Sequence, residues 1–244
     1  MHAKSTALPY SRVLVKVSGE AFCLPGGFGI DPEAVNVVVQ ELAPVFDMGV
    51  QIALVVGGGN FFRGATLSES SYIDRATADG MGMLATVMNA LALQDVLDHR
   101  QMPARVLSAV PTAGLCEPYI RRRALRHLEK RRIVILAGGT GSPFFTTDTC
   151  AALRASELQA GVLFKATKVD GVFEADPVTH PSAKRFDRLT YAEVLARQLG
   201  VMDLAAVSLC MESKIPVIVL RLATPGHLAA AVRGQPVGTV IAAQ

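Results

Sequence analysis

The chain has 244 residues and carries 24 lysines and arginines against 21 aspartates and glutamates, a formal net charge of +3. Hydrophobic residues make up 50% and charged residues 18%, which excludes wholesale disorder, and so small an excess of cations does not indicate a nucleic-acid binder. No apolar run approaches the ~20 residues of a membrane span, residues 1–10 do not read as a signal peptide, and the four cysteines form no C-x-x-C pair. We therefore expect a cytoplasmic globular protein with a tail at 1–10 and a single domain at 11–244, without nucleic-acid or membrane partners.

Short β-branched runs alternate with helical segments along the chain. The first strand is predicted at 12–17, and a helix follows from Asp31 and Pro32, which suit the N-cap and first helical positions, to about Met48, with Gly49 at its C′ position. Further strands are predicted at 51–56, 105–109, 133–137, 162–166 and 216–220. Further helices are predicted at 81–99, 119–131, 148–160, 191–199 and 203–212.

The predicted strands are nearly continuous in apolar residues. Such runs fit a parallel sheet that is covered on both faces. We therefore predict an α/β fold, a three-layer α/β/α sandwich with a mostly parallel central sheet, with ligands beyond the carboxyl ends of the strands. The irregular, proline-containing segment 170–189 is predicted to be a surface lobe rather than a separate domain.

Three of these strands end in turns rich in glycine or small residues, at 18–19, 57–59 and 138–141. Glycine lets backbone N–H groups approach an anion closely, and Lys16 and Arg63 add cations beside the first two turns. The turns therefore predict a polyphosphate site. The alternative is that the glycines only allow close packing of helices on the sheet. The P-loop and dinucleotide-binding motifs are both absent.

Several segments together resemble one family. They are KVSGEA from Lys16, GGGN from Gly57 with Arg63-Gly64 after it, Asp79 ahead of MGMLATVMN, GTGSPFFTTD from Gly139, KATKVDGVF from Lys165 and VMDLAA from Val201. This pattern, spread over about 12–240, resembles the bacterial uridylate kinases (UMP kinases) of the amino-acid-kinase superfamily. MGMLATVMN and PFFTTD are specific to that family, whereas the first two segments indicate only the superfamily.

The resemblance implies an amino-acid-kinase-like domain with an acceptor-binding N-terminal part and an ATP-binding C-terminal part. It implies ATP-dependent phosphorylation of UMP to UDP in pyrimidine nucleotide biosynthesis. The alternatives are another kinase of the superfamily, acting on a small carboxylate or carbamate, and a nucleotide-binding regulator without catalysis. The PFFTTD loop argues against the first alternative, and the joint presence of Lys16, Arg63 and Asp203 argues against the second.

The resemblance also assigns roles to residues. Asp203 matches an aspartate that holds the lysine of the phosphate loop in place, although it also suits the N-cap of a helix, and Asp148 is either catalytic or a helix cap. The residues expected to be catalytic are Lys16, Arg63, Asp203 and Asp148. Those expected to bind ATP are Lys16, Val17, Ser18, Gly19, Gly59, Arg63, Thr167, Phe173 and Asp176. Those expected to bind UMP are Gly58, Asp79, Thr140, Gly141, Ser142, Pro143, Phe144, Phe145, Thr146 and Thr147.

The sequence departs from the family pattern in three places. Ser142 stands where asparagine is usual, and Gly80 stands where a larger residue is common. The segment LRLATP at 220–225 replaces the usual F-N-x-x-x-P, which leaves the contacts there open, with Arg221 as a new cation.

The resemblance further implies partners and regulation. Mg²⁺ is expected to arrive with ATP and to be held by phosphate oxygens, with no protein ligand named. UTP is the expected inhibitor, and a homohexamer built as a trimer of dimers is expected, with the apolar helix at 81–97 a candidate for dimer packing. In GTP-responsive members a basic site lies between subunits. Four positions of this chain match that site. Arg105 and Arg132 are basic, as in those members, whereas Gln94 and Asp98 stand where a basic residue is usual, so we expect weak or no GTP activation. The basic stretch at 121–132 is either a solvated face or part of such a site.

Overall fold

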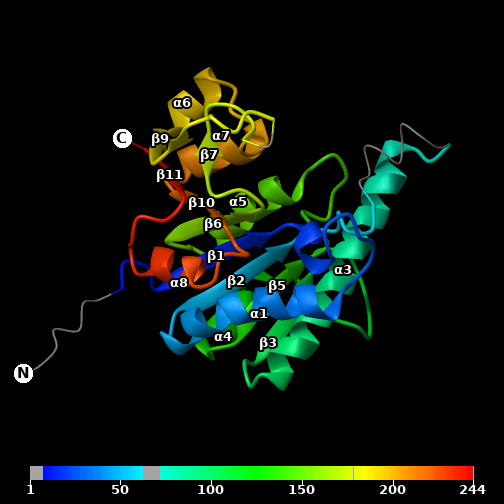
Figure 1. The fold of residues 1–244 in the computed structure, drawn as a ribbon. Helices are drawn as coiled ribbons and strands as arrows, with labels where there is room; N and C mark the ends of the chain where they lie inside the picture. The colour runs from blue at the N-terminus through cyan, green and yellow to red at the C-terminus, as the bar shows by residue number, and fades with distance from the viewer. Residues whose placement is uncertain (1–7, 63–71, 178, 244) are drawn as a thin grey trace, which may run out of the picture.

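The computed structural model describes residues 8–62, 72–177 and 179–243 (Figure 1). The strands are β1 (Arg12–Val17), β2 (Gln51–Val56), β3 (Ala104–Ser108), β4 (Glu117–Pro118), β5 (Ile133–Ala137), β6 (Val162–Thr167), β7 (Val172–Phe173), β8 (Arg185–Phe186), β9 (Arg188–Thr190), β10 (Val217–Arg221) and β11 (Thr239–Ala242). The helices are α1 (Pro32–Asp47), α3 (Arg75–His99), α4 (Arg121–Glu129), α5 (Thr147–Glu157), α6 (Tyr191–Ala196), α7 (Leu204–Glu212) and α8 (His227–Val232), with a 3₁₀ turn η1 (Gly19–Phe22).

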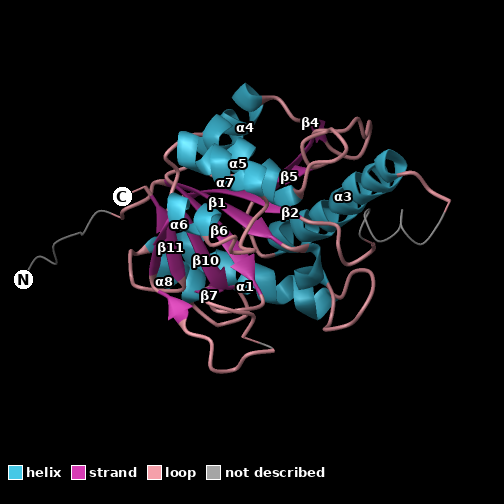
Figure 2. Cartoon of the chain, turned by 90° about the horizontal axis from the view of Figure 1, so that it is seen from above, coloured by secondary structure: helices cyan, strands magenta, loops and turns pink. Residues whose placement is uncertain are grey.

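The central sheet has nine strands in the order β4-β3-β5-β2-β1-β6-β10-β11-β9. Every neighbouring pair in it is parallel except β10 and β11. Helices cover both faces of the sheet (Figure 2). Helices α1, α3 and α8 pack on one face and α4, α5, α6 and α7 on the other. The prediction of a three-layer, mostly parallel α/β fold is confirmed.

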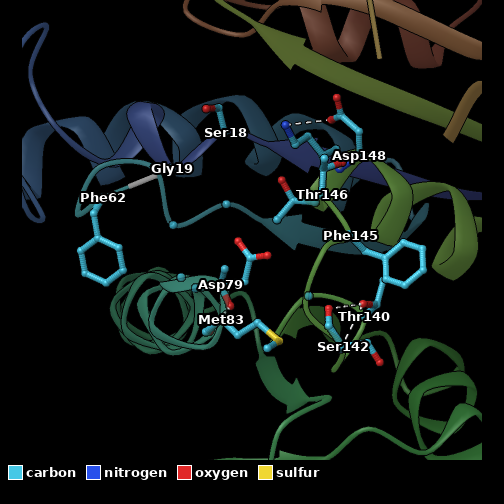
Figure 3. Close-up of a pocket in the computed structure, with 18 of the residues that line it drawn as sticks. Ser18, Gly19, Phe62, Asp79, Met83, Thr140, Ser142, Phe145, Thr146 and Asp148 are labelled. Atoms are coloured by element: carbon cyan, nitrogen blue, oxygen red, sulfur yellow. Dashed lines mark hydrogen bonds and ion pairs between the residues drawn. The ribbon is translucent and has the colours of Figure 1, made fainter. Parts of the chain in front are cut away.

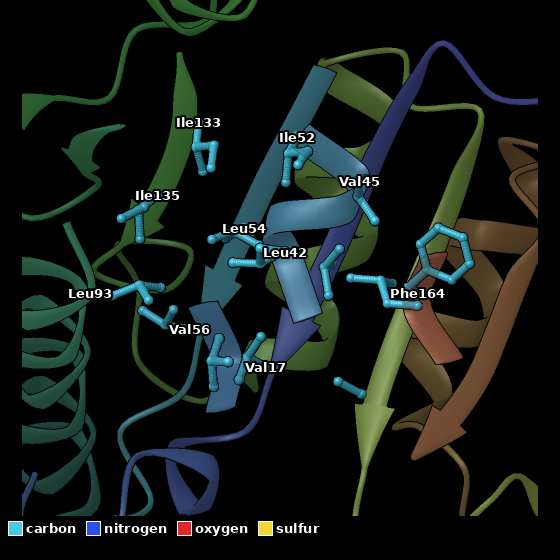
Figure 4. Close-up of a cluster of buried hydrophobic side chains, with 14 of the residues drawn as sticks. Val17, Leu42, Val45, Ile52, Leu54, Val56, Leu93, Ile133, Ile135 and Phe164 are labelled. Atoms are coloured by element: carbon cyan, nitrogen blue, oxygen red, sulfur yellow. The ribbon is translucent and has the colours of Figure 1, made fainter. Parts of the chain in front are cut away.

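Side chains of β1 alternate between the two layers of the core. Val13, Val15 and Val17 pack on the α1 side, and Leu14 packs on the α5 side. On the α1 side, Leu42 and Val45 of the helix lie over the strands among buried valines, leucines and isoleucines (Figure 4). Because β1 is buried on both faces and paired on both edges, the residue after Val17 is held at a fixed position.

Helix α1 begins and ends where its sequence predicts. The Asp31 carboxylate accepts hydrogen bonds from the backbone N–H groups of Glu33 and Ala34, each at 2.9 Å. Gly49 has a φ of +80°, the left-handed conformation that favours glycine after a helix end.

Other boundaries differ from the predictions. Helix α3 begins at Arg75 rather than at 81, because Asp74 caps it by accepting from the Thr77 N–H at 3.0 Å. Helices α4, α5 and α6 are shorter than predicted, and β3, β6 and β10 differ from their predicted ranges by one residue at one or both ends. The predicted elements also lacked η1, β4, β9, α8 and β11. The segment 170–189 contains the two-stranded sheet of β7 and β8, which stands apart from the main sheet.

Helix α3 is long and apolar enough to cross a membrane, contrary to our expectation that no segment reaches this length and hydropathy. It packs against α1, β3 and β5, and Ala85, Leu93 and Leu97 are fully buried in those contacts. A core helix of a globular protein meets the same criterion, so the finding is weak support for a membrane span.

The core on the α1 side gives the first prediction. Leu42 is 1% exposed, so Leu42→Ala is expected to lower the free energy of unfolding by about 2–5 kcal/mol through lost burial and a residual cavity. Urea unfolding followed by circular dichroism measures this change. The matched control is Leu204→Ala on the exposed side of α7, for which a change within about 0.5 kcal/mol is expected. Equal losses for the two variants would contradict the assigned packing.

Candidate active site

The three glycine-containing turns meet at the carboxyl edge of the sheet and enclose a cavity of about 400 Å³, called here the first cavity (Figure 3). The N-terminal half of α3 and the start of α5 complete its wall. The predicted site residues that line it are Lys16, Ser18, Gly19, Gly58, Gly59, Asp79, Thr140, Ser142, Phe145, Thr146, Thr147 and Asp148. Sequence segments more than 120 residues apart therefore contribute to one hollow.

Some predicted residues do not line this cavity. Val17 is buried in the sheet, and Gly141, Pro143 and Phe144 belong to the loop after β5 without being part of the lining. Arg63 lies outside the described residues. The lining also includes Phe62, Arg75, Gly82, Met83 and Thr86, to which the sequence analysis gave no role.

The glycines of the first two turns differ in the space around them. A Cβ atom on Gly19 would lie 2.3 Å from the Gly59 nitrogen, and one on Gly58 would lie 2.7 Å from the Gly82 oxygen. At these two positions close packing requires glycine, in agreement with the alternative that the glycines serve packing. A Cβ atom on Gly59 would meet nothing within 4 Å, so its backbone faces open space. Gly59 is the position at which an anion has room to approach.

Two buried polar residues of α3 hold the turns from behind. The Asn89 amide donates to the Gly57 carbonyl at 2.7 Å and exchanges hydrogen bonds with the Asn60 amide at 2.7 and 2.9 Å. The Thr86 hydroxyl accepts from the Gly138 N–H at 2.8 Å. These contacts explain the polar residues within MGMLATVMN, because each satisfies a buried backbone group of a turn.

A carboxylate lies between two lysines beside the first cavity. The Asp148 side chain pairs with Lys16 Nζ at 2.9 Å and with Lys165 Nζ at 2.6 Å. Lys16 and Lys165 are register partners on β1 and β6, so their side chains leave the same face of the sheet. Burial opposes the charged carboxylate, but the two ammonium groups outweigh it and hold the pKa of Asp148 below its ordinary value. Burial lowers the pKa of Lys165, and Asp148 only partly offsets this effect.

The aspartate that holds Lys16 is therefore Asp148 and not Asp203, which corrects the role expected for Asp203. Asp203 caps α7 by accepting from the Ala206 N–H at 2.9 Å, and it also accepts from the hydroxyls of Thr146 and Thr149. It thus fixes the start of α5.

The helix-cap alternative for Asp148 is wrong. Thr146 is the N-cap of α5, and its hydroxyl accepts from the N–H of Asp148 at 3.0 Å and of Thr149 at 3.2 Å. The Asp148 carboxylate instead forms ion pairs with Lys16 and Lys165. The resemblance gives Lys165 no role. A lysine within an otherwise buried apolar strand needs a charged partner, and that is the sequence signal that points to a carboxylate beside it.

The loop after β5 is anchored to α3 by Asp79. The Asp79 carboxylate accepts from Arg75 Nε at 2.9 and 3.0 Å and from the Phe144 N–H at 2.8 Å. Phe144 has a φ of +70°, a left-handed conformation that is uncommon for residues other than glycine. Within the loop, Thr140 and Ser142 exchange hydrogen bonds at 3.1 and 3.2 Å.

The residues expected around the donor base lie in another cavity, of about 520 Å³, called here the second cavity. Thr167, Phe173 and Asp176 line it, together with Lys165 and the segment 197–201. Since Lys16 and Asp148 line the first cavity, the pair of lysines around Asp148 stands between the two hollows.

The residues expected at a regulatory site lie on the opposite flank. Arg105 Nη1 is 3.9 Å from the Asp98 carboxylate, and Gln94 accepts from the Val106 N–H at 3.0 Å. Arg132 lies 3.2 Å from His127 Nδ1. Gln94 and Arg105 line a hollow of about 300 Å³, and Arg132 is not part of its lining.

No group of three or more histidine, cysteine, aspartate or glutamate side chains suited to a metal ion occurs within the described residues. Near the first cavity, Asp148 is paired with lysines, Asp79 with Arg75, and Asp203 with threonine hydroxyls.

Comparison with known proteins places this geometry in a family. The model of the amino acid kinase family matches residues 11–221. The structure resembles a UMP kinase from Bacillus anthracis with a TM-score of 0.92 and 38% identity, covering 96% of each chain. It resembles a UMP kinase from Ureaplasma parvum with a TM-score of 0.89 and 31% identity, covering 95% of this chain and 98% of the other. It resembles a uridylate kinase from Archaeoglobus fulgidus with a TM-score of 0.72 and 30% identity, covering 94% of this chain and 99% of the other.

The lysine pair predicts how stability depends on pH. Asp148→Asn removes the carboxylate that pairs with two mostly buried lysines, so we expect a loss of about 3–5 kcal/mol in the free energy of unfolding at pH 7. The pKa of Asp148 is lower in the folded chain than in the unfolded chain, where it is about 3.9. The contribution of its charge to the free energy of unfolding is therefore complete above the unfolded pKa and is lost as the pH falls through the folded pKa.

The difference in unfolding free energy between the two proteins should therefore be constant from pH 7 to about 5 and should shrink below pH ~4. Urea unfolding at a series of pH values measures it. A difference that stays constant at the lowest pH would show that Asp148 does not act through its charge.

Proposed function

We propose that this chain, which belongs to the amino acid kinase family, is a UMP kinase that transfers the γ-phosphoryl group of ATP to UMP and forms UDP and ADP. The observation that carries the proposal is the pair of cavities that meet at the Lys16–Asp148–Lys165 cluster. Phosphoryl transfer requires two nucleotides to be held with their phosphates in line and their charges neutralised. Two hollows with cations between them supply this arrangement.

The first cavity is suited to UMP and the second to the base and ribose of ATP. The loop from Thr140 to Thr147 offers backbone groups and hydroxyls that can hydrogen-bond a uracil edge, and Asp79 offers a carboxylate to ribose hydroxyls. Thr167, Phe173 and Asp176 offer a hydroxyl, an aromatic face and a carboxylate to adenosine. The triphosphate would then extend from the second cavity toward Lys16.

In the reaction, an oxygen of the UMP phosphate attacks the γ-phosphorus, the bond to the leaving ADP oxygen breaks, and the γ-phosphoryl group passes between them. Lys16 and Lys165 stabilise the charge on the transferring oxygens, and Asp148 keeps both ammonium groups in place. The N-terminus of the eleven-residue helix α5, which lines the first cavity, also offers backbone N–H groups to the phosphates.

Mg²⁺ bound to the ATP phosphates supplies further neutralisation of charge. The carboxylates of Asp79, Asp148 and Asp203 are already paired, which fits a cation carried by phosphate oxygens and water rather than by a cage of protein ligands.

The remaining expectations are part of the same proposal: pyrimidine nucleotide biosynthesis, a cytoplasmic location, inhibition by UTP and a homohexamer built from dimers. For the dimer, α3 exposes Leu84 and Met88, which are 53% and 43% exposed, on its outer side. UTP carries the same base as UMP and competes for the first cavity.

The proposal is tested by following ADP release with ATP and a panel of UMP, CMP, AMP, aspartate and N-acetylglutamate. UMP is expected to be the preferred acceptor, and CMP is expected to be much poorer, because a site that hydrogen-bonds a base rejects an analogue with reversed donors and acceptors. Comparable kcat/KM values for CMP and UMP would refute the assignment of the base. Turnover of aspartate or N-acetylglutamate alone would support the alternative of a carboxylate kinase, and absence of turnover with every acceptor would support a regulator.

Lys16→Ala is expected to lower kcat by about 10²–10³-fold, with a much smaller change in UMP binding, because the charge acts on the transferring group. Steady-state kinetics and UMP titration calorimetry separate the two effects. Lys130→Ala, at the exposed C-cap position just after α4, is the control and should keep the original kcat. Normal turnover of Lys16→Ala would show that the turn after β1 has no catalytic role.

GTP is expected to activate the enzyme weakly or not at all. The Arg105 guanidinium faces Asp98, and Gln94 is engaged by the Val106 backbone, so this flank offers few free cations to a triphosphate. Each charge-assisted contact that is missing costs roughly 1.5–3 kcal/mol of affinity. A GTP titration at subsaturating and saturating UMP measures the effect, and several-fold activation at micromolar GTP would contradict it.

A further inference from the structure

Two asparagine side chains are buried together behind the glycine turn that follows β2. Asn60 is 3% exposed and Asn89 of α3 is fully buried, and neither is part of the lining of the first or the second cavity. Burying a polar side chain is costly unless its donors and acceptors find partners. These two residues can therefore affect a bound nucleotide only through the protein groups that they contact.

The two amides form a closed pair in which every amide hydrogen has an acceptor. The Asn89 amide donates to Asn60 Oδ1 and to the Gly57 carbonyl, both at 2.7 Å. The Asn60 amide donates to Asn89 Oδ1 at 2.9 Å and to the Gly29 carbonyl at 2.7 Å. A carboxamide offers two donors and an acceptor, which neither a carboxylate nor an apolar side chain does. The pair therefore depends on a carboxamide at both positions.

The amide pair contacts two of the three glycine turns. Gly57, whose carbonyl accepts from Asn89, begins the turn in which Gly58 and Gly59 line the first cavity. A Cβ atom on Gly19 would lie 2.8 Å from Asn60 Oδ1, so the turn after β1 packs directly against the pair. The pair therefore sets the separation between the turns after β1 and β2.

A third buried polar residue of α3 contacts the turn after β5. Thr86 is 2% exposed, and its hydroxyl donates to the Met83 carbonyl at 2.6 Å and accepts from the Gly138 N–H at 2.8 Å. Gly138 leads into the loop 140–147, which the proposed function assigns to UMP. Thr86 and Asn89 are three residues apart, so they lie on the same face of the helix. One face of α3 thus supports the phosphate turns and the acceptor loop.

We propose that the Asn60–Asn89 pair and Thr86 are positioning residues for phosphoryl transfer and that they affect different kinetic constants. The pair sets the turns beside the transferring phosphoryl group and therefore determines kcat. Thr86 sets the loop that holds the acceptor and therefore determines the KM for UMP. A displacement of about 1 Å is enough to lower a rate by about 10²-fold. The inference rests on the proposed function and deepens it with residues outside the expected binding set.

The amide pair is tested with Asn89→Asp, which keeps the size and polarity of the side chain and loses both donors. We expect kcat to fall about 10–100-fold while the KM values for UMP and ATP change by less than about threefold. Asn60→Ala, Asn89→Ala and the double variant form a cycle that does not depend on the aspartate. Because the two amides act as one unit, the double variant should lose no more kcat than the more impaired single variant. Multiplicative losses would contradict the pair.

Thr86 is tested with two substitutions that separate its hydroxyl from its methyl group. Thr86→Val keeps the shape and loses the hydroxyl, so the KM for UMP should rise about tenfold, with kcat within about twofold of the original. Thr86→Ser keeps the hydroxyl and should restore both constants. Titration calorimetry with UMP should show the same order of affinities. Impairment of the serine variant instead would show that the methyl group contacts the ligand directly and would overturn the positioning role.

Tyr191→Phe is the matched control for loss of a buried hydrogen bond. Tyr191 is 3% exposed and donates to the carbonyl of Ile215, which precedes β10 at the edge of the sheet opposite the cavities. This variant should keep the original kcat and KM. Thermal unfolding of each variant sets an assay temperature at which it is fully folded, so that a loss of activity does not report unfolding.

The unmodified chain separates the two levels of inference. If it does not turn over UMP, the proposed function fails and this inference fails with it. If it turns over UMP and the folded Asn60 and Asn89 variants keep kcat, only the positioning role of the pair is overturned. A fall of kcat in Tyr191→Phe as large as in Asn89→Asp would also overturn it, because any lost buried hydrogen bond would then have the same effect.

Discussion

The carboxylate of Asp148, held between Lys16 and Lys165, links one helix to two neighbouring strands of the sheet. It connects α5 to the two central strands of the sheet, β1 and β6, at the edge where the cavities open. Two ammonium groups at neighbouring strand positions would repel each other without it, so their position depends on one aspartate in the first turn of a helix. Asp203 in turn fixes that turn through Thr146 and Thr149. The geometry of the site is therefore set by a chain of polar contacts between α7, α5 and the sheet.

The glycine turns show the second constraint, which is space. Gly19 and Gly58 are required because backbone atoms of neighbouring segments lie where a Cβ atom would stand. Polar side chains of α3 then satisfy the turns from inside the protein, through Thr86 and Asn89. Close packing and anion binding are thus not competing explanations for these turns. Packing brings the turns together, and the open side of Gly59 is left for a ligand.

The fold was largely predictable because its strands are continuous apolar runs bounded by glycines, and such runs specify a covered parallel sheet. The short elements β4 and β9 could not be predicted, since two or three residues carry no periodicity. The cavity residues were mostly predicted from the turns and the resemblance. The partner of Lys16 was not, because it depends on which of two aspartates, Asp148 or Asp203, the tertiary structure brings to the lysine. Arg75 was missed because it lies before the apolar part of α3.

The order of strands in the sheet has a consequence for how the protein behaves at high concentration. Exposed sheet edges allow other chains to add a strand, which is a common beginning of aggregation. Here one edge is β4, whose two residues are Glu117 and Pro118, and the other is β9, with three residues that begin with Arg188. Mean hydropathy is +0.35, yet the most apolar strands lie inside the sheet and are paired on both sides. The main sheet in the described part of the chain therefore offers little template for strand addition.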